Sequence, residues 1–153
     1  MTNDVSVFTI LDFDNVSKSK SDFFHEVSFL ISGSLMDEVK PKEIESAILE
    51  REILGTTGFG NGLAIPHGKV ANLKESCLFY VRCKHDIEWD SLDEKPAKYI
   101  FIILVATNDE SNNHLKILSK LSYNLMDPEY QEKIKNEKNS ENLRNVIEEM
   151  FTD

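Results

Sequence analysis

The chain has 153 residues and a mass of 17.5 kDa, the size of a single domain, and we expect one domain over residues 1–153. Its 27 acidic and 17 basic side chains give a net charge of −10, which argues against nucleic acid or an anionic membrane surface as the main partner. The longest apolar run, residues 99–106, is too short to span a bilayer, and residues 1–4 do not resemble a signal peptide. We therefore expect a cytoplasmic protein without direct membrane insertion.

The first third of the chain predicts a strand followed by two helices. Residues 5–11 are apolar enough for a strand, Ser19 fits the start of a capping box, and Pro41 suits the first position of a second helix. Apolar residues at helical spacing mark the buried faces. They are Phe24, Val27, Ile31 and Leu35 in the first helix, and Ile44, Ala47, Ile48 and Leu54 in the second.

The middle of the chain combines a glycine-rich segment with two apolar runs. Five of the six glycines lie between positions 55 and 68, and we interpret this segment as a loop. Residues 76–83 and 99–106 are rich in β-branched and aromatic residues and predict two buried strands, joined by a charged connection that includes residues 93–96.

The last third predicts three helices. The first carries a strong apolar stripe, namely Leu115, Ile117, Leu118, Leu121 and Leu125. Asp127 and Pro128 end it and begin another helix, and Ser140 is the predicted cap of the last one. Helices mixed with buried strands predict an α/β fold, a single layered domain in which helices cover a mixed β-sheet.

His67 is the best candidate for a reactive side chain. It ends the run 58–67, in which Pro66 stiffens the backbone before it, and Gly68 frees the backbone after it. Glycine-rich backbone also lets N–H groups approach an anion closely. An imidazole held beside such a segment suits phosphate chemistry, although glycine-rich segments with one histidine are more often simple turns.

Two further residues interrupt apolar stripes. Arg51 lies seven residues after Ile44, and its guanidinium either extends to solvent at the edge of the stripe or faces an anion site. His114 lies seven residues before Leu121, as either a satisfied core histidine or a functional one. Such interruptions are expected at functional sites, so both stay candidates beside His67.

The other histidines and the cysteines suggest no second site. His25 and His85 fit exposed surface positions, and Cys77 and Cys83 are too far apart along one strand to form a disulfide. A metal site with His67 and His114 as ligands is an alternative, but no ligands occur at metal-binding spacing. We therefore expect neither a metal nor an organic cofactor.

These motifs resemble the active-site signature of enzyme IIA domains of the fructose/mannitol class (EIIA type-2), from bacterial phosphoenolpyruvate-dependent sugar phosphotransferase systems (PTS). The resemblance covers most of the chain and is weakest before Ser19. The similar stretches are 51–52, 55–58, 60–68, 86–89, 93–96, 114–118 and 125–130. It implies the fold of that family, a mixed β-sheet covered by helices.

The resemblance also implies a phosphocarrier. In that family, the histidine that matches His67 takes a phosphoryl group from the carrier protein HPr and passes it to a cysteine of the partner enzyme IIB during sugar uptake. The residues that match Arg51 and His114 flank it, and the resemblance suggests Nε2 as the phosphorylated nitrogen. Nitrogen-type relatives instead regulate other proteins according to their phosphorylation state, and this remains the alternative function.

Overall fold

The computed structural model describes residues 5–35, 38–107 and 113–151, with side chains described from residue 115 onward in the last range. A mixed six-stranded sheet runs through it, in the order β1-β5-β6-β3-β2, with β4 also paired to β6. The strands are β1 (Ser6–Phe13), β2 (Gly58–Gly60), β3 (Leu63–Ala64), β4 (His67–Val70), β5 (Cys77–Ile87) and β6 (Ala97–Ala106). The antiparallel pair β5 and β6 forms the centre of the sheet.

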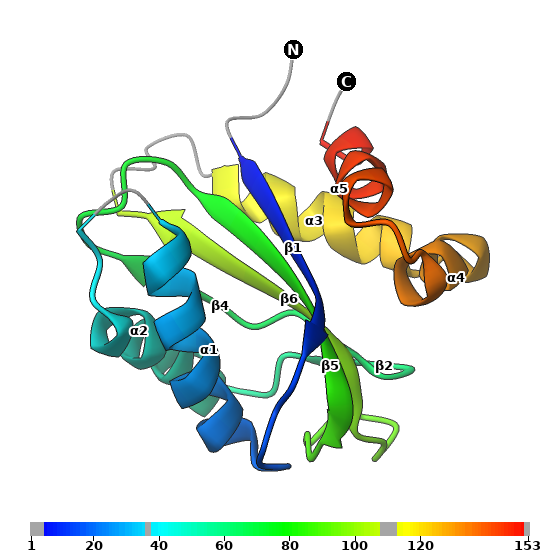
Figure 1. Ribbon diagram of the computed structural model, residues 1–153, viewed down its shortest axis with the longest axis horizontal. Coiled ribbons are helices and arrows are strands. Elements are labelled where there is room, and N and C mark those ends of the chain that lie inside the picture. Colours follow the sequence, from blue (N-terminus) through cyan, green and yellow to red (C-terminus); the bar gives the residue numbers. More distant parts are fainter. Residues whose placement is uncertain (1–4, 36–37, 108–112, 152–153) are drawn as a thin grey trace.

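Helices cover both faces of this sheet (Figure 1). On one face lie α1 (Lys20–Ser34) and α2 (Pro41–Ile53), and on the other lie α3 (Asn113–Leu125), α4 (Pro128–Asn136) and α5 (Ser140–Glu149). Alternate residues of β5 serve the two cores, because Phe79 packs with the first helix layer and Leu78 with the second. The predicted layered α/β fold is therefore confirmed. None of the described helices is both long and apolar enough to cross a membrane.

Helix starts follow the predicted capping chemistry. The side chain of Ser19 accepts a hydrogen bond from a backbone N–H in the first turn of α1, and Pro41 is the first residue of α2. Asp127 caps α4 in the same way. The predicted cap of the last helix is wrong by one residue, since the side chain of Asn139 caps α5 and Ser140 is already helical.

Two leucines that the sequence places in apolar stripes are exposed instead. Leu54 follows the last residue of α2 and is 81% exposed, because the helical period no longer applies beyond the end of the helix. Leu115 lies in the first turn of α3 and is 58% exposed. Both side chains lie at the pocket described below.

The glycine-rich segment differs most from its prediction. It forms β2, β3 and β4 rather than a loop, because each short strand is completed by pairing with another part of the chain. Asn61 and Gly62 join β2 to β3 with φ angles of 55° and 82°, which a two-residue hairpin turn requires. Residues 84–87, predicted as part of a connection, belong to β5.

The thiol of Cys83 is expected to react slowly in the folded protein. Both cysteines are buried, and burial raises the pKa of Cys83 from its ordinary value of 9.0 to about 12. Because the folded state holds this proton more tightly than the unfolded chain, the free energy of unfolding should fall as the pH rises above 9. Labelling with a thiol reagent at pH 8 should be much slower than in denaturant. Equal rates in both conditions would contradict the buried placement.

Candidate functional site

His67 is the first residue of β4, beside Ile103 of β6. Its half-buried imidazole lies with Nδ1 3.0 Å from the carbonyl oxygen of Ile65. A carbonyl oxygen only accepts hydrogen bonds, so this contact assigns the proton to Nδ1 and leaves the lone pair on Nε2. Pro66, which has no N–H to donate, separates β3 from β4, and its own carbonyl accepts the N–H of Ile103 at 3.0 Å. The histidine is therefore fixed by a strand and oriented by a backbone carbonyl.

Gly68 lets β4 pack directly against α2. A β-carbon at this position would lie 2.6 Å from both the carbonyl carbon and the carbonyl oxygen of Ala47, so only glycine fits without a backbone shift. This close approach brings His67 next to the helix that carries Arg51. The glycine that follows the histidine is thus needed for close packing, whereas its φ angle is not positive, so the special backbone conformation expected from the sequence is not found.

The substitution Gly68→Ala is expected to lower the free energy of unfolding by about 1–3 kcal/mol, because the added methyl group forces β4 and α2 apart. Chemical denaturation measures this loss. Gly33→Ala is the matched control, since a β-carbon at Gly33 meets no atom within 4 Å and alanine favours the helix there. Equal stability of the two variants would contradict the close packing described here.

Arg51 and His67 line the same pocket, which has a volume of about 360 Å³. Residues of α2, β4, β6 and α3 form its walls. The half-buried Arg51 side chain donates from Nη1 to the carbonyl oxygen of Gly55 at 2.9 Å. Arg51 thus lies at the pocket that contains His67, and its predicted role toward an anion stays a prediction.

His114 lies in the first turn of α3, and its side chain is outside the described residues. The next residue, Leu115, lines the pocket together with Leu118 one turn later. The start of α3 therefore borders the pocket that contains His67 and Arg51. The role predicted for His114 stays a prediction.

The rim of this pocket is apolar, which the sequence did not reveal. Leu54 and Leu115 line it and are largely exposed, while the neighbouring Ile53 is 83% exposed. Phe59 in β2 is half-buried and packs against the core. In the sequence, only the positions of these leucines indicated exposure, since Leu54 lies at the end of one helix and Leu115 at the beginning of another.

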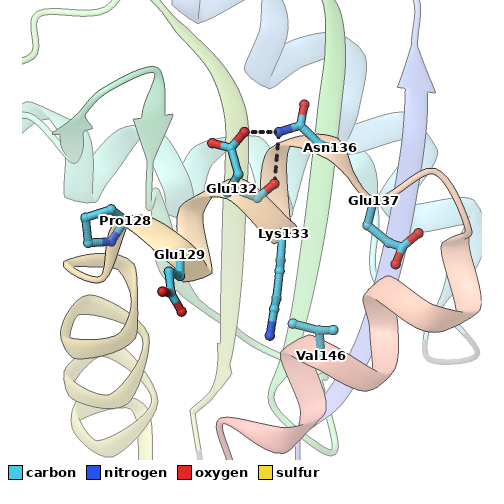
Figure 2. A pocket seen from close by; sticks show the side chains of 7 residues that line it. All are labelled: Pro128, Glu129, Glu132, Lys133, Asn136, Glu137 and Val146. Atoms are coloured by element: carbon cyan, nitrogen blue, oxygen red, sulfur yellow. Dashed lines mark hydrogen bonds between the residues drawn. The ribbon is translucent and has the colours of Figure 1, made fainter.

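A larger hollow lies between α4 and α5 and has a volume of about 830 Å³ (Figure 2). Its polar side chains are mainly carboxylates, and Asn136 donates to both the side chain and the carbonyl of Glu132. Among the residues that the structure describes, no histidine or cysteine lines this hollow, so they offer no nucleophile there comparable to His67.

The remaining histidines occupy surface positions, as predicted. His25 is 60% exposed and pairs with Glu45, and His85 is 58% exposed near Asp14. Within the described ranges, no three His, Cys, Asp or Glu side chains are grouped closely enough to hold a metal ion.

Sequence comparison relates residues 9–150 to the family described as "Phosphoenolpyruvate-dependent sugar phosphotransferase system, EIIA 2". The PTS system fructose-specific EIIA component of Haloferax volcanii is 38% identical over 104 residues, which cover 68% of this chain and 67% of that protein. The Escherichia coli nitrogen regulatory protein is 35% identical over 111 residues, covering 70% and 66%. The PTS system fructose-specific EIIABC component of Bacillus subtilis is 35% identical over 133 residues, covering 86% of this chain but only 20% of the longer protein.

Solved structures give the same relationship. The nitrogen regulatory protein IIA-Ntr from Neisseria meningitidis superposes with a TM-score of 0.77 and 30% identity, covering 90% of this chain and 92% of its own. In a complex of enzyme IIAMTL with phosphorylated enzyme IIBMTL from Escherichia coli, a chain superposes with a TM-score of 0.66 and shares the fold at 18% identity, with 93% of each chain covered. With the family match over almost its whole length, this chain belongs to the EIIA type-2 family of the phosphoenolpyruvate-dependent sugar phosphotransferase system.

Proposed function

We propose that this protein is a phosphocarrier in which His67 accepts a phosphoryl group from phosphorylated HPr and passes it to a cysteine of an enzyme IIB. The observation that carries the proposal is the hydrogen bond between His67 Nδ1 and the Ile65 carbonyl, which leaves Nε2 as the nucleophile. Arg51 lines the same pocket and supplies a fixed positive charge.

The transfer is an exchange of one phosphorus–nitrogen bond for another. The lone pair of His67 Nε2 attacks the phosphorus on the donor histidine of HPr, the donor's P–N bond breaks, and the donor imidazole keeps that electron pair. In the second step, a cysteine thiolate of enzyme IIB attacks the phosphorus, and the bond to Nε2 breaks. The phosphoryl group stays reactive on nitrogen, as a covalent relay requires, and neither a metal nor an organic cofactor takes part.

Arg51 and His114 stabilise the transferring group in this proposal. Its transition state spreads negative charge over three oxygens, so that positioned donors supply most of the catalysis. The Arg51 guanidinium keeps its Nη1 contact with the Gly55 carbonyl and donates from its other N–H groups to two of these oxygens. His114, at the start of α3, donates to another.

The surface around the pocket suits transient protein partners. Exposed Leu54 and Leu115 offer apolar contact beside His67, and the net charge of −10 favours partners with basic docking faces. The solved IIAMTL complex with phosphorylated IIBMTL supports an enzyme IIB as the acceptor. We place this exchange in the cytoplasm.

A regulatory function is the second candidate. It is favoured by the similar identity to a fructose-specific component and to a nitrogen regulatory protein, 38% and 35%. In that case, His67 takes the phosphoryl group in the same way, but the output is binding of a target protein in one phosphorylation state. Transfer of the phosphoryl group to an enzyme IIB distinguishes transport from regulation.

The test combines the protein with phosphoenolpyruvate, enzyme I and HPr, followed by measurement of intact mass. The expected result is one added phosphoryl group that is lost in acid and that moves to an added enzyme IIB. A protein that accepts the phosphoryl group but transfers it to no tested enzyme IIB, and that binds a target protein in one phosphorylation state only, would favour regulation. No mass gain, with HPr active toward a control acceptor, would refute the proposed phosphocarrier.

A further inference from the structure

Glu52, the residue after Arg51, is an almost completely buried carboxylate. Its side chain is 4% exposed, at the end of α2. The carboxylate accepts the backbone N–H of Thr57 at 2.9 Å and the hydroxyl of the same residue at 2.6 Å. It also pairs with the ammonium of Lys20 at 3.1 Å. Both carboxylate oxygens are therefore engaged, and two of the three contacts fix Thr57.

From Thr57, a chain of hydrogen bonds leads to the imidazole of His67. The carbonyl of Thr57 accepts the N–H of Ile65 at 3.0 Å. The carbonyl of Ile65 accepts the Nδ1 proton of His67, also at 3.0 Å. The carboxylate of Glu52 is thus connected to the imidazole of His67 by hydrogen bonds through the backbone of Thr57 and Ile65.

The backbone and the side chain of Glu52 also contact the two ends of the turn that holds Arg51. The N–H of Gly55 donates to the backbone carbonyl of Glu52 at 3.2 Å, and the Gly55 carbonyl accepts from Arg51 Nη1 at 2.9 Å. The Glu52 side chain binds Thr57, which lies two residues after Gly55. Glu52 therefore contacts the chain both at Gly55 and beyond it. Hydrogen bonds thus connect Glu52 to His67 through Thr57 and Ile65, and to Arg51 through Gly55.

We propose that Glu52 is a positioning residue for phosphoryl transfer. Through Thr57 and Ile65, it sets the tautomer and orientation of His67. Through the turn at Gly55, it sets the position of Arg51. The inference rests on the proposed function for its rate effects, but its effect on the His67 imidazole does not depend on any donor. A carboxylate suits this role because it accepts strong, charge-assisted hydrogen bonds from several donors at once.

Lys20 explains how the buried charge is tolerated. Its ammonium pairs with Glu52 and also with Asp90 at 2.6 Å, and it lies 5.3 Å from the ring centre of Trp89. The hydrogen bond from Lys20 lowers the pKa of Asp90. A buried carboxylate with a fixed counter-charge keeps its acceptors in place, whereas an unpaired one would be strongly destabilising.

The experiment compares Glu52→Ala and Glu52→Gln in the full chain. The amide oxygen of glutamine still accepts the N–H of Thr57, so Glu52→Gln should rescue most of what alanine loses. A third variant, Thr57→Val, keeps the backbone N–H and removes only the hydroxyl contact. Glu45→Gln is the matched control on the same helix, since Glu45 pairs with the exposed His25.

Nitrogen-15 NMR of the His67 ring is the first measurement, and it uses the unphosphorylated protein. The wild type and Glu45→Gln should show a single Nδ1-protonated tautomer, which Glu52→Gln retains and Glu52→Ala loses in part. Phosphoryl transfer from HPr should then be roughly tenfold to 100-fold slower in Glu52→Ala, mainly in kcat rather than KM. Thr57→Val should fall between the wild type and Glu52→Ala in both measurements.

The outcomes separate this inference from the proposed function. A wild-type His67 tautomer in both Glu52→Ala and Thr57→Val would overturn the positioning role, whatever the rates. If Glu52→Ala does not fold, an unchanged tautomer and rate in Thr57→Val would overturn it, since Glu52→Gln is expected to resemble the wild type. Failure of the wild type to accept a phosphoryl group would refute only the proposed function, because the NMR comparison would still decide the role of Glu52.

Discussion

His67→Ala is expected to abolish phosphoryl uptake from phosphorylated HPr while the protein stays folded. The substitution removes the only nucleophile proposed for the reaction, so no mass gain should be detected at any time point. The free energy of unfolding should fall by only about 1 kcal/mol, since the side chain is half-buried and the backbone pairing of β4 with β6 remains. Intact mass and thermal unfolding together measure both effects.

The exposed histidines provide the control for this substitution. His25→Ala and His85→Ala remove side chains that are 60% and 58% exposed, and both variants should gain a phosphoryl group as the wild type does. If His67→Ala were still phosphorylated to the normal level, or if an exposed histidine were required instead, the assignment of the acceptor would be wrong.

Arg51→Ala is expected to slow phosphoryl transfer by about 100-fold to 1000-fold, with the acceptor still present. The guanidinium lines the pocket with His67 and offers two donors to the transferring group. Arg51→Lys keeps the charge but loses the paired donors, so its rate should lie between those of alanine and the wild type. Rapid-quench measurement of transfer from HPr provides the rates.

The matched control is Arg144→Ala, which removes a half-exposed arginine of α5 that pairs with Glu148. Its transfer rate should equal that of the wild type, because the global charge change is the same but the site is untouched. A rate for Arg51→Ala within twofold of the wild type would show that the guanidinium does not stabilise the transferring group.

The fold was largely predictable, because its signals are local in the sequence. Ser19 and Asp127 cap their helices through side chains that reach backbone groups a few residues away, and such contacts can be read directly from spacing. The apolar runs of β5 and β6 are long enough to be recognised as buried strands without any partner. The layered arrangement follows from burying these strands on both faces.

The glycine-rich segment was not predictable as strands, since its structure depends on distant parts of the chain. β3 and β4 exist because they pair with β6, more than 30 residues later, and glycine disfavours strands when judged by propensity alone. The hairpin turn at Asn61 and Gly62 has a sequence signal, but its flanking strands are too short to show alternation.

The residues of the candidate site were easier to predict from the sequence than the hydrogen bonds between them. His67 and Arg51 were recognisable because they interrupt or end a pattern, and the structure places both at one pocket. The role of Glu52 was hidden, because a glutamate near the end of a helix is ordinarily exposed. Only the tertiary contacts to Thr57 and Lys20 distinguish it.

The most direct test of the account is NMR of the phosphorylated protein with nitrogen-15 in its histidines. A single phosphoryl group on Nε2 of His67, with phosphorus coupling to that nitrogen and the proton retained on Nδ1, is the predicted result, because the Ile65 carbonyl holds the Nδ1 proton. Phosphorus bound to Nδ1, or to a residue other than His67, would contradict the account.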